Sequence, residues 1–205
     1  MSTSRPRRRR VKSNARGVQS RDAILSCAAK YFAEHGYRGT STATIAQAAD
    51  LSEPGLLHHF PTKNALLKAL LELRYSLDES KFHADEALAG LTLFPLLAQL
   101  VRENVSQRGS VKLTTVILAE SILPSHPAHR YFKLRFTRAR GIVAAHLSRA
   151  QQQGFMRRDV DAARLATILL AVMDGLQLQW LLDPRVDMAG CFAEFSRILE
   201  GAVAR

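Results

Sequence analysis

The clearest chemical feature of this 205-residue chain is a cluster of positively charged side chains at its N-terminus. The whole chain has 29 Lys and Arg against 18 Asp and Glu, a net charge of +11. Guanidinium groups gathered at one end of a chain favour contact with a polyanion, either nucleic acid or an anionic membrane surface. The first 21 residues contain no acidic side chain and eight basic ones: Arg5, Arg7, Arg8, Arg9, Arg10, Lys12, Arg16 and Arg21.

Patterns typical of enzymes and metal sites are missing from the sequence. It has no Gly-x-Ser-x-Gly, P-loop or His-Glu-x-x-His motif. His126 and His129 are spaced as a helical pair, but no Cys or acidic companion at a useful spacing completes a zinc site. Cys27 and Cys191 are too few for a disulfide framework and fit a reducing compartment. We therefore expect a protein that is not an enzyme and needs no metal or cofactor.

Membrane insertion and export are also disfavoured. Residues 11–22 are polar, so the apolar region of a signal peptide is absent. The longest apolar stretch, residues 165–182, is interrupted by Thr167, Asp174, Gln177 and Gln179. It resembles a buried helix more than a span of about 20 apolar residues. The expectation is a cytoplasmic protein without a membrane partner.

Apolar residues recur at helical spacing throughout, which predicts an all-α fold. A first helix is expected from a Ser20 cap to Gly36 in the left-handed position after the helix. Ser41, Ser52 and Thr62 are expected to cap the next three helices, the second of which covers Pro54 to His59. The remainder predicts five helices, near residues 92–106, 110–123, 127–152, 161–182 and 187–202.

Two short helices separated by the turn Asp50-Leu51-Ser52 and flanked by longer helices form a helix-turn-helix pattern. The second short helix is compact enough to enter a DNA major groove about 12 Å wide. The turn needs a residue with positive φ, and Asp50 tolerates that conformation. This pattern makes double-stranded DNA the expected partner.

The segment GYRGTSTATIAQAADLSEPGLLHHFPTKNALL, residues 36–67, resembles the DNA-binding part of the TetR family of transcriptional regulators. HPAHRYFKLRF at 126–136 and MDGLQLQWLLDP at 173–184 resemble the C-terminal part of its betaine-biosynthesis-type repressors. The resemblance implies an N-terminal three-helix helix-turn-helix DNA-binding domain joined to a larger C-terminal helical bundle. Asp50 and Leu57 depart from the family, which commonly has Gly and a phosphate-contacting Tyr there. The expected divisions are a basic disordered arm (1–18), the DNA-binding domain (19–65) and an effector-binding and dimerisation domain (66–205).

Several residue types near the predicted recognition helix suit DNA contact. His58 is the best candidate for a base edge, whereas Leu57 can contact a thymine methyl group or pack inward. Lys63 begins the next helix, where its ammonium and the helix N-terminus both favour phosphate. The hydroxyls of residues 40–42 can bind the DNA backbone, or serve as a helix cap and a surface threonine. The arm can enter the minor groove or remain a solvated tail. The candidate DNA-binding residues are Arg8, Arg9, Arg10, Thr40, Ser41, Thr42, Gly55, Leu57, His58 and Lys63.

The C-terminal part is larger than support of a DNA-binding domain requires, so we expect a cavity for a small-molecule effector among its helices. An apolar stripe at helical spacing can equally be ordinary core. Asp174 and Gln177 share a helix face and can bind each other or a partner subunit instead. The candidate pocket residues are Phe94, Leu97, Val101, Val116, Glu120, Phe132, Phe136, Met173, Gln177 and Trp180.

The helix at 161–182 is apolar nearly all round, which requires cover on every side. This predicts a homodimer through the last two helices. The resulting hypothesis is a ligand-responsive transcriptional repressor, which binds a palindromic operator as a dimer and is released by an effector. The alternative is a general nucleic-acid-binding protein that acts mainly through its basic N-terminal arm.

Overall fold

The computed structural model describes residues 7–83 and 92–205; the side chains of 7–16, 18 and 75–83 lie outside this description. Within the described ranges every regular element is a helix, which confirms the all-α prediction. The helices are α1 (Arg7–His35), α2 (Thr42–Ala48), α3 (Glu53–His59), α4 (Lys63–His83), α5 (Leu93–Ser106), α6 (Arg108–Glu120), α7 (His129–Gln152), α8 (Ala162–Leu182) and α9 (Met188–Val203).

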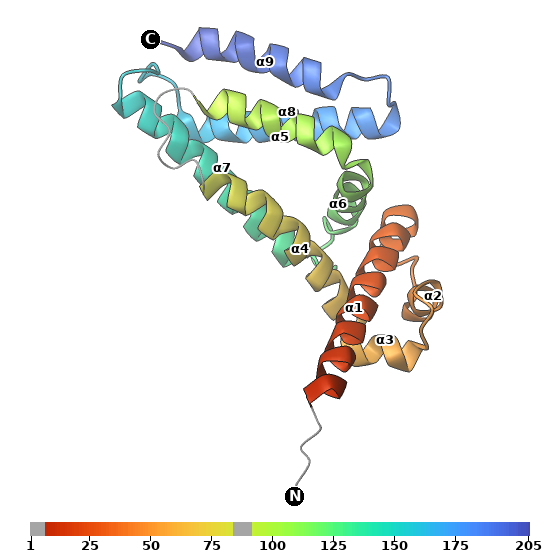
Figure 1. The fold of residues 1–205 in the computed structure, drawn as a ribbon. Coiled ribbons are helices and arrows are strands. Elements are labelled where there is room, and N and C mark those ends of the chain that lie inside the picture. The colour runs from red at the N-terminus through yellow and green to blue at the C-terminus, as the bar shows by residue number, and fades with distance from the viewer. Residues whose placement is uncertain (1–6, 84–91) are drawn as a thin grey trace, which may run out of the picture.

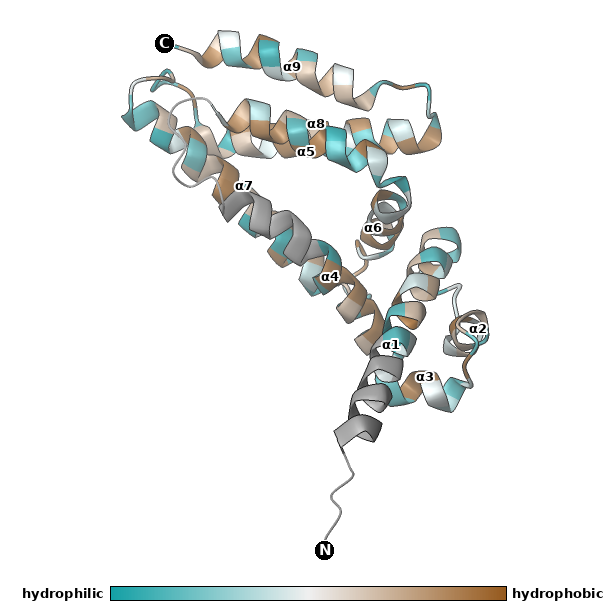
Figure 2. Cartoon of the chain, in the orientation of Figure 1, coloured by the Kyte–Doolittle hydropathy of each residue, from teal (hydrophilic) through white to brown (hydrophobic). Residues whose placement is uncertain are grey.

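The chain forms a small unit and a larger one (Figure 1). Helices α1, α2 and α3 make the small unit, and α4 leads from it alongside α7. The small unit corresponds to the predicted DNA-binding domain and is called the DNA-binding unit below. Helices α5, α8 and α9 stack at the far end, and α6 lies between that stack and α1. The apolar residues follow this division, with buried positions concentrated where helices face one another (Figure 2).

Two buried clusters hold the fold together. The first joins α1 to α4 with residues from α6 and α7, among them Phe32, Ile117 and Phe132. The second lies among α5, α7, α8 and α9 and includes Phe94 and Phe192. Because Ile117 of α6 is buried in the same cluster as α1, the small unit is packed directly against the larger one.

The sequence signals at the helix ends act as predicted. Ser41 caps α2 by accepting from the Thr44 amide at 3.0 Å, and Ser52 caps α3 by accepting from the Gly55 amide at 3.2 Å. Gly36 ends α1 with φ +71°, and Asp50 occupies the turn with φ +56°. Each of these contacts is local, so sequence spacing alone determines it.

The start of α1 differs from the expectation. The helix begins at Arg7, so the backbone of residues 7–18 is helical where the sequence predicts a disordered arm, and Ser20 lies inside the helix instead of capping it. Between Arg7 and His35 the sequence has no proline and Gly17 as its single glycine. Nothing in that stretch stops a helix that is already nucleated by the packing of residues 24–33.

Candidate DNA-binding surface and ligand cavity

Helix α3 presents a short, mostly exposed face. Glu53, Pro54 and His58 are exposed, whereas Leu56 is fully buried. Leu57 is half-buried and packs against the core, so of the two alternatives for this residue the structure shows the inward one. His58 keeps its ring on the surface, 5.7 Å from the His59 ring, and remains the candidate for base contact.

The hydroxyls expected to contact DNA have partners within the protein. Thr40 is buried, and its Oγ1 donates to the Gly36 carbonyl at 2.8 Å, so the prediction of a DNA contact by this side chain is wrong. Ser41 is the α2 cap described above, and the Thr42 hydroxyl donates to the Glu53 carboxylate. The amide of Gly55 is likewise used, by the Ser52 cap. These groups shape the helix-turn-helix and leave few donors free on it.

Lys63 also departs from its expected role. Its Nζ donates to the Thr40 carbonyl at 2.6 Å and lies 4.3 Å from the centre of the Tyr37 ring. Partial burial lowers the pKa of this ammonium, and the negative charge of Glu120 opposes that shift. The ammonium therefore holds the loop between α1 and α2 against the start of α4, where the sequence predicts a phosphate contact.

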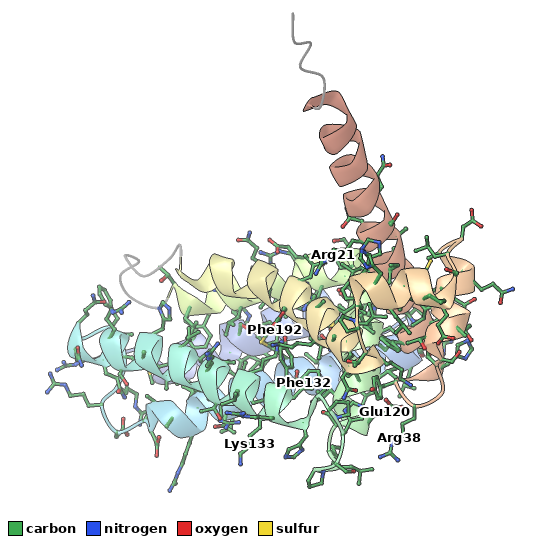
Figure 3. All side chains as sticks on the ribbon, turned by 90° about the horizontal axis from the view of Figure 1, so that it is seen from below. Arg21, Arg38, Glu120, Phe132, Lys133 and Phe192 are labelled. Carbon is green, nitrogen blue, oxygen red and sulfur yellow. The ribbon has the colours of Figure 1, made fainter. Side chains whose placement is uncertain are left out.

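Glu120 lies at the junction between the two units, so its assignment to the effector pocket is wrong. Its Oε2 accepts from the Tyr37 amide at 2.8 Å and lies 3.5 Å from Nε2 of the buried His126. Burial lowers the pKa of His126; Glu120 opposes that shift and Arg38 reinforces it. Figure 3 shows Glu120 and Arg38 at this edge of the DNA-binding unit. Spacing along the chain carries no signal for this junction, because Tyr37 and Glu120 are far apart in sequence.

Arg21 is a further basic residue at the DNA-binding unit that the sequence-based set omits. Its guanidinium lies over the Phe60 ring, 5.0 Å from the centre, and the side chain is exposed beside the end of α3. Figure 3 labels it next to α1. The N-terminal charge count includes Arg21, but only the fold shows that it lies near the recognition helix. The side chains of Arg8, Arg9 and Arg10 lie outside the described residues.

A cavity of about 110 Å³ lies between α4 and α8 in the larger unit. It is lined by Leu71, Arg74, Leu100, Val101, Asn104, Val111, Thr114, Thr115, Leu118, Tyr131, Arg135, Phe136, Ala139, Ile142, Val143, Leu170, Met173, Asp174, Gln177 and Met188.

Four of the predicted pocket residues line this cavity: Val101, Phe136, Met173 and Gln177. Six do not, for reasons of packing that periodicity cannot show. The core buries Phe94, Leu97 and Phe132. The Arg108 guanidinium lies over the Trp180 ring, 4.8 Å from its centre, and Val116 is half-buried outside the lining. Glu120 is the carboxylate at the junction of the two units.

Polar groups converge on the cavity from several helices. Gln177 Nε2 donates to Thr115 Oγ1 at 3.0 Å, and the Tyr131 hydroxyl donates to the Leu71 carbonyl at 2.8 Å. Burial raises the pKa of Asp174, and the guanidinium of Arg135 opposes that shift. Apolar side chains make up most of the remaining wall, so the cavity has the mixture of surfaces found in small-molecule sites.

Helices α8 and α9 expose large apolar side chains on the outside of the molecule. Leu178 is 50% exposed, Leu182 79% and Ile198 57%. By length and composition alone, α8 is the one helix in the described ranges that could cross a membrane, and α7 and α9 pack against it. An exposed apolar surface of this kind marks a site of contact with another protein or with a membrane.

Two sequence families match this chain. Residues 24–70 match the N-terminal model of bacterial regulatory proteins of the TetR family, and residues 95–203 match the C-terminal domain of BetI-type transcriptional repressors. Together these matches cover most of the chain. The protein belongs to the TetR family of DNA-binding transcriptional regulators, as the resemblance in the sequence indicates.

Individual relatives agree with this assignment. The chain is 25% identical over 193 residues to the transcriptional regulator TtgR of Pseudomonas putida, covering 89% of each chain. It is 26% identical to UidR of Escherichia coli over 161 residues, 77% of this chain and 79% of UidR. A solved regulator from Saccharomonospora viridis in complex with choline has the same fold, with a TM-score of 0.74, 24% identity and coverage of 92% and 99%.

Proposed function

We propose that this protein is a dimeric transcriptional repressor that acts in the cytoplasm and releases a two-fold symmetric DNA operator when a small molecule occupies the cavity. One observation carries the proposal: two helices reach from the DNA-binding unit to the cavity. Helix α4 begins at Lys63, whose ammonium donates to the Thr40 carbonyl, and it lines the cavity with Leu71 and Arg74. Helix α6 lines it with Thr114 and Thr115 and ends beside the junction.

Coupling through these helices depends on differential binding. An effector that prefers one angle between the units shifts the population toward it, with typical coupling free energies of about 1–3 kcal/mol. A ligand with equal affinity for both arrangements releases no DNA. The packing of α1 against α6 and the hydrogen bond at Tyr37 favour movement of the DNA-binding unit with α6.

A dimer supplies the second recognition helix. Two α3 helices must be about 34–36 Å apart to enter successive major grooves of one DNA face. The exposed apolar side chains of α8 and α9 support a dimer interface made by these two helices. Pairing of two copies covers the outer face of α8 that a single chain leaves open.

Binding-site selection followed by footprinting tests the proposal. Random duplexes are selected with the full chain at moderate ionic strength, and the enriched sequence is footprinted. A protected region with two-fold symmetry is expected. Similar affinity for unrelated duplexes, governed by salt alone, would favour the alternative of a general nucleic-acid-binding protein acting through its N-terminal charge.

Replacement of Arg8, Arg9 and Arg10 by Gln also distinguishes an operator-specific repressor from a general nucleic-acid-binding protein. If these residues bind phosphates, the slope of log affinity against log salt becomes shallower by about 0.9 for each phosphate that is no longer neutralised. A repressor that reads DNA through α3 keeps its preference for the selected operator in this variant. A general nucleic-acid-binding protein loses most of its affinity for every duplex.

A further inference from the structure

We infer that the cavity between α4 and α8 takes a small organic acid and that Arg135 holds its carboxylate. This inference rests on the proposed function, since it names the chemical class of the effector. The charged side chains of the lining are Arg74, Arg135 and Asp174, two positive and one negative. The lining therefore has an excess of positive charge around a mainly apolar space.

Arg135 carries the charge that most needs a partner. It comes from α7, is half-buried and lies with its guanidinium 5.8 Å from the centre of the Phe136 ring. Among the residues whose side chains are described, no ion pair involves Arg135. Arginine stays protonated at all accessible pH values, so a half-buried guanidinium keeps its charge whatever its surroundings.

Asp174 is the one acidic side chain among the described residues that line the cavity. It lies on α8, where burial raises the pKa of its carboxyl group. No hydrogen bond or ion pair to Asp174 is found among the described side chains, and Arg135 interacts with it only at longer range. An incoming carboxylate can pair with the Arg135 guanidinium, whereas an incoming cation leaves that guanidinium unpaired and is repelled by Arg135 and Arg74.

Arg74 does not compete for this role. Its guanidinium donates to Asn104 Oδ1 at 2.9 Å and to Gln107 Oε1 at 3.1 Å, so it has neutral acceptors on α5 and in the residue after it. Its charge still adds to the positive potential of the cavity. Arg135, in contrast, presents the planar donor fork that binds carboxylates with two parallel hydrogen bonds.

The size of the cavity limits the ligand. A cavity of about 110 Å³ is somewhat smaller than the engineered apolar cavity of about 150 Å³ that binds benzene. The apolar part of the ligand is therefore limited to one small ring or a short branched chain, and its carboxylate is expected to lie at Arg135, which is partly exposed to solvent. The apolar part would contact residues such as Val101, Ile142 and Met173.

Three ligands of nearly identical shape separate charge from size: benzoate, benzamide and benzamidine. Their affinities for the full chain are measured by calorimetry at low ionic strength, without DNA. Benzoate is expected to bind most tightly and benzamidine most weakly, with about tenfold or more between them. Tighter or equal binding of benzamidine, or no detectable binding of any of the three at millimolar concentration, overturns the inference.

Variants assign the effect to Arg135. Arg135→Gln is expected to weaken benzoate binding about tenfold and to remove the preference over benzamide, whereas Arg135→Lys keeps the order of the ligands. Asp174→Asn retains benzoate binding. Arg138→Gln, an exposed position on the same helix, is the matched control and leaves all three affinities unchanged. Thermal unfolding of each free variant establishes that it is folded, and an unchanged benzoate affinity in folded Arg135→Gln contradicts the assignment.

The outcome is separable from that of the proposed function. If the protein selects a symmetric operator but binds none of the three probes, only the proposed effector class is contradicted. If it binds the probes in the expected order but never selects an operator, only the proposed regulatory function is contradicted.

Discussion

The backbone amide of Tyr37 donates a hydrogen bond to the carboxylate of Glu120, at 2.8 Å. Tyr37 follows the glycine that ends α1, and Glu120 is the last residue of α6. These two helix ends are 83 positions apart in sequence, so the hydrogen bond fastens the larger unit to the DNA-binding unit through a charged acceptor. Such bonds are about twice as strong as neutral ones.

Removal of this acceptor should destabilise the protein. Glu120→Ala leaves the half-buried Tyr37 amide without its partner, and we expect the free energy of unfolding to fall by about 1–3 kcal/mol. Urea denaturation measures the change. Glu72→Ala is the control, because Glu72 is exposed and pairs with Lys68 on the surface of α4, where about 0.5 kcal/mol or less is expected. Equal effects of the two substitutions would contradict the role of Glu120.

Gly36 is required by the same contact. Its φ is +71°, and a Cβ built there lies 2.2 Å from Glu120 Oε1. Gly154 has φ +83° with no atom within 4 Å of such a Cβ, so Gly154→Ala measures the cost of the left-handed backbone conformation alone. We expect Gly154→Ala to cost about 1–2 kcal/mol and Gly36→Ala to cost clearly more, by urea denaturation. Similar losses at both positions would mean that the Glu120 side chain moves away freely.

The stability of the protein should fall in mild acid because of His126. Burial lowers the pKa of this ring in the folded chain, whereas the unfolded chain takes up a proton near about pH 6.5. Below about pH 6.5 the unfolded state binds more protons, so stability decreases as the pH falls toward the folded pKa, by up to about 1.4 kcal/mol per pH unit. His126→Gln should flatten this part of the profile of urea midpoint against pH. A profile identical to that of the wild-type chain would refute the prediction.

His58 should carry sequence preference. It is an exposed side chain of α3 with a ring nitrogen for a base edge, so His58→Ala is expected to weaken binding to the selected operator by about 1–3 kcal/mol and leave affinity for unrelated duplexes unchanged. Fluorescence anisotropy with both duplexes measures this. Equal weakening on both duplexes would assign His58 a backbone contact.

The outer faces of α8 and α9 should hold the dimer. Leu182→Glu places a charge at a side chain that is 79% exposed in one chain, and we expect a monomer with weakened operator binding. Ile122→Glu is a matched control, since Ile122 is 75% exposed but lies after α6, away from both helices. Sedimentation in detergent-free buffer measures mass. A dimer that survives Leu182→Glu, or a wild-type chain that needs detergent, contradicts the α8–α9 interface.

Local signals in the sequence predict the helix-turn-helix well. The Ser41 and Ser52 caps and the positive φ of Gly36 and Asp50 depend on residues within four positions of one another. The same signals misplace the start of α1, because a cap residue such as Ser20 can also lie within a helix once the chain on both sides is helical. Helix boundaries therefore depend on context that spacing does not contain.

The candidate sites are harder to predict for a different reason. Periodicity shows that Phe94 and Trp180 are buried, but not whether a neighbouring side chain or an empty space lies beside them. The same limit applies to polar groups, since Thr40 and Lys63 have the right chemistry for DNA, yet the Thr40 hydroxyl donates to the Gly36 carbonyl and the Lys63 ammonium donates to the Thr40 carbonyl. Arg135 is absent from the predicted pocket because a charged residue in a basic stretch of α7 is indistinguishable in sequence from a surface residue.

The unbroken course of α4 has a mechanical consequence. Lys63 and Arg74 lie on the same helix and are separated by about 16 Å along its axis. A stiff helix of that length converts a small tilt at the cavity wall into a displacement of the whole DNA-binding unit, without unwinding any turn. In the proposed mechanism, a ligand that shifts the cavity end of α4 therefore changes the separation of the two recognition helices of the dimer without unfolding either unit.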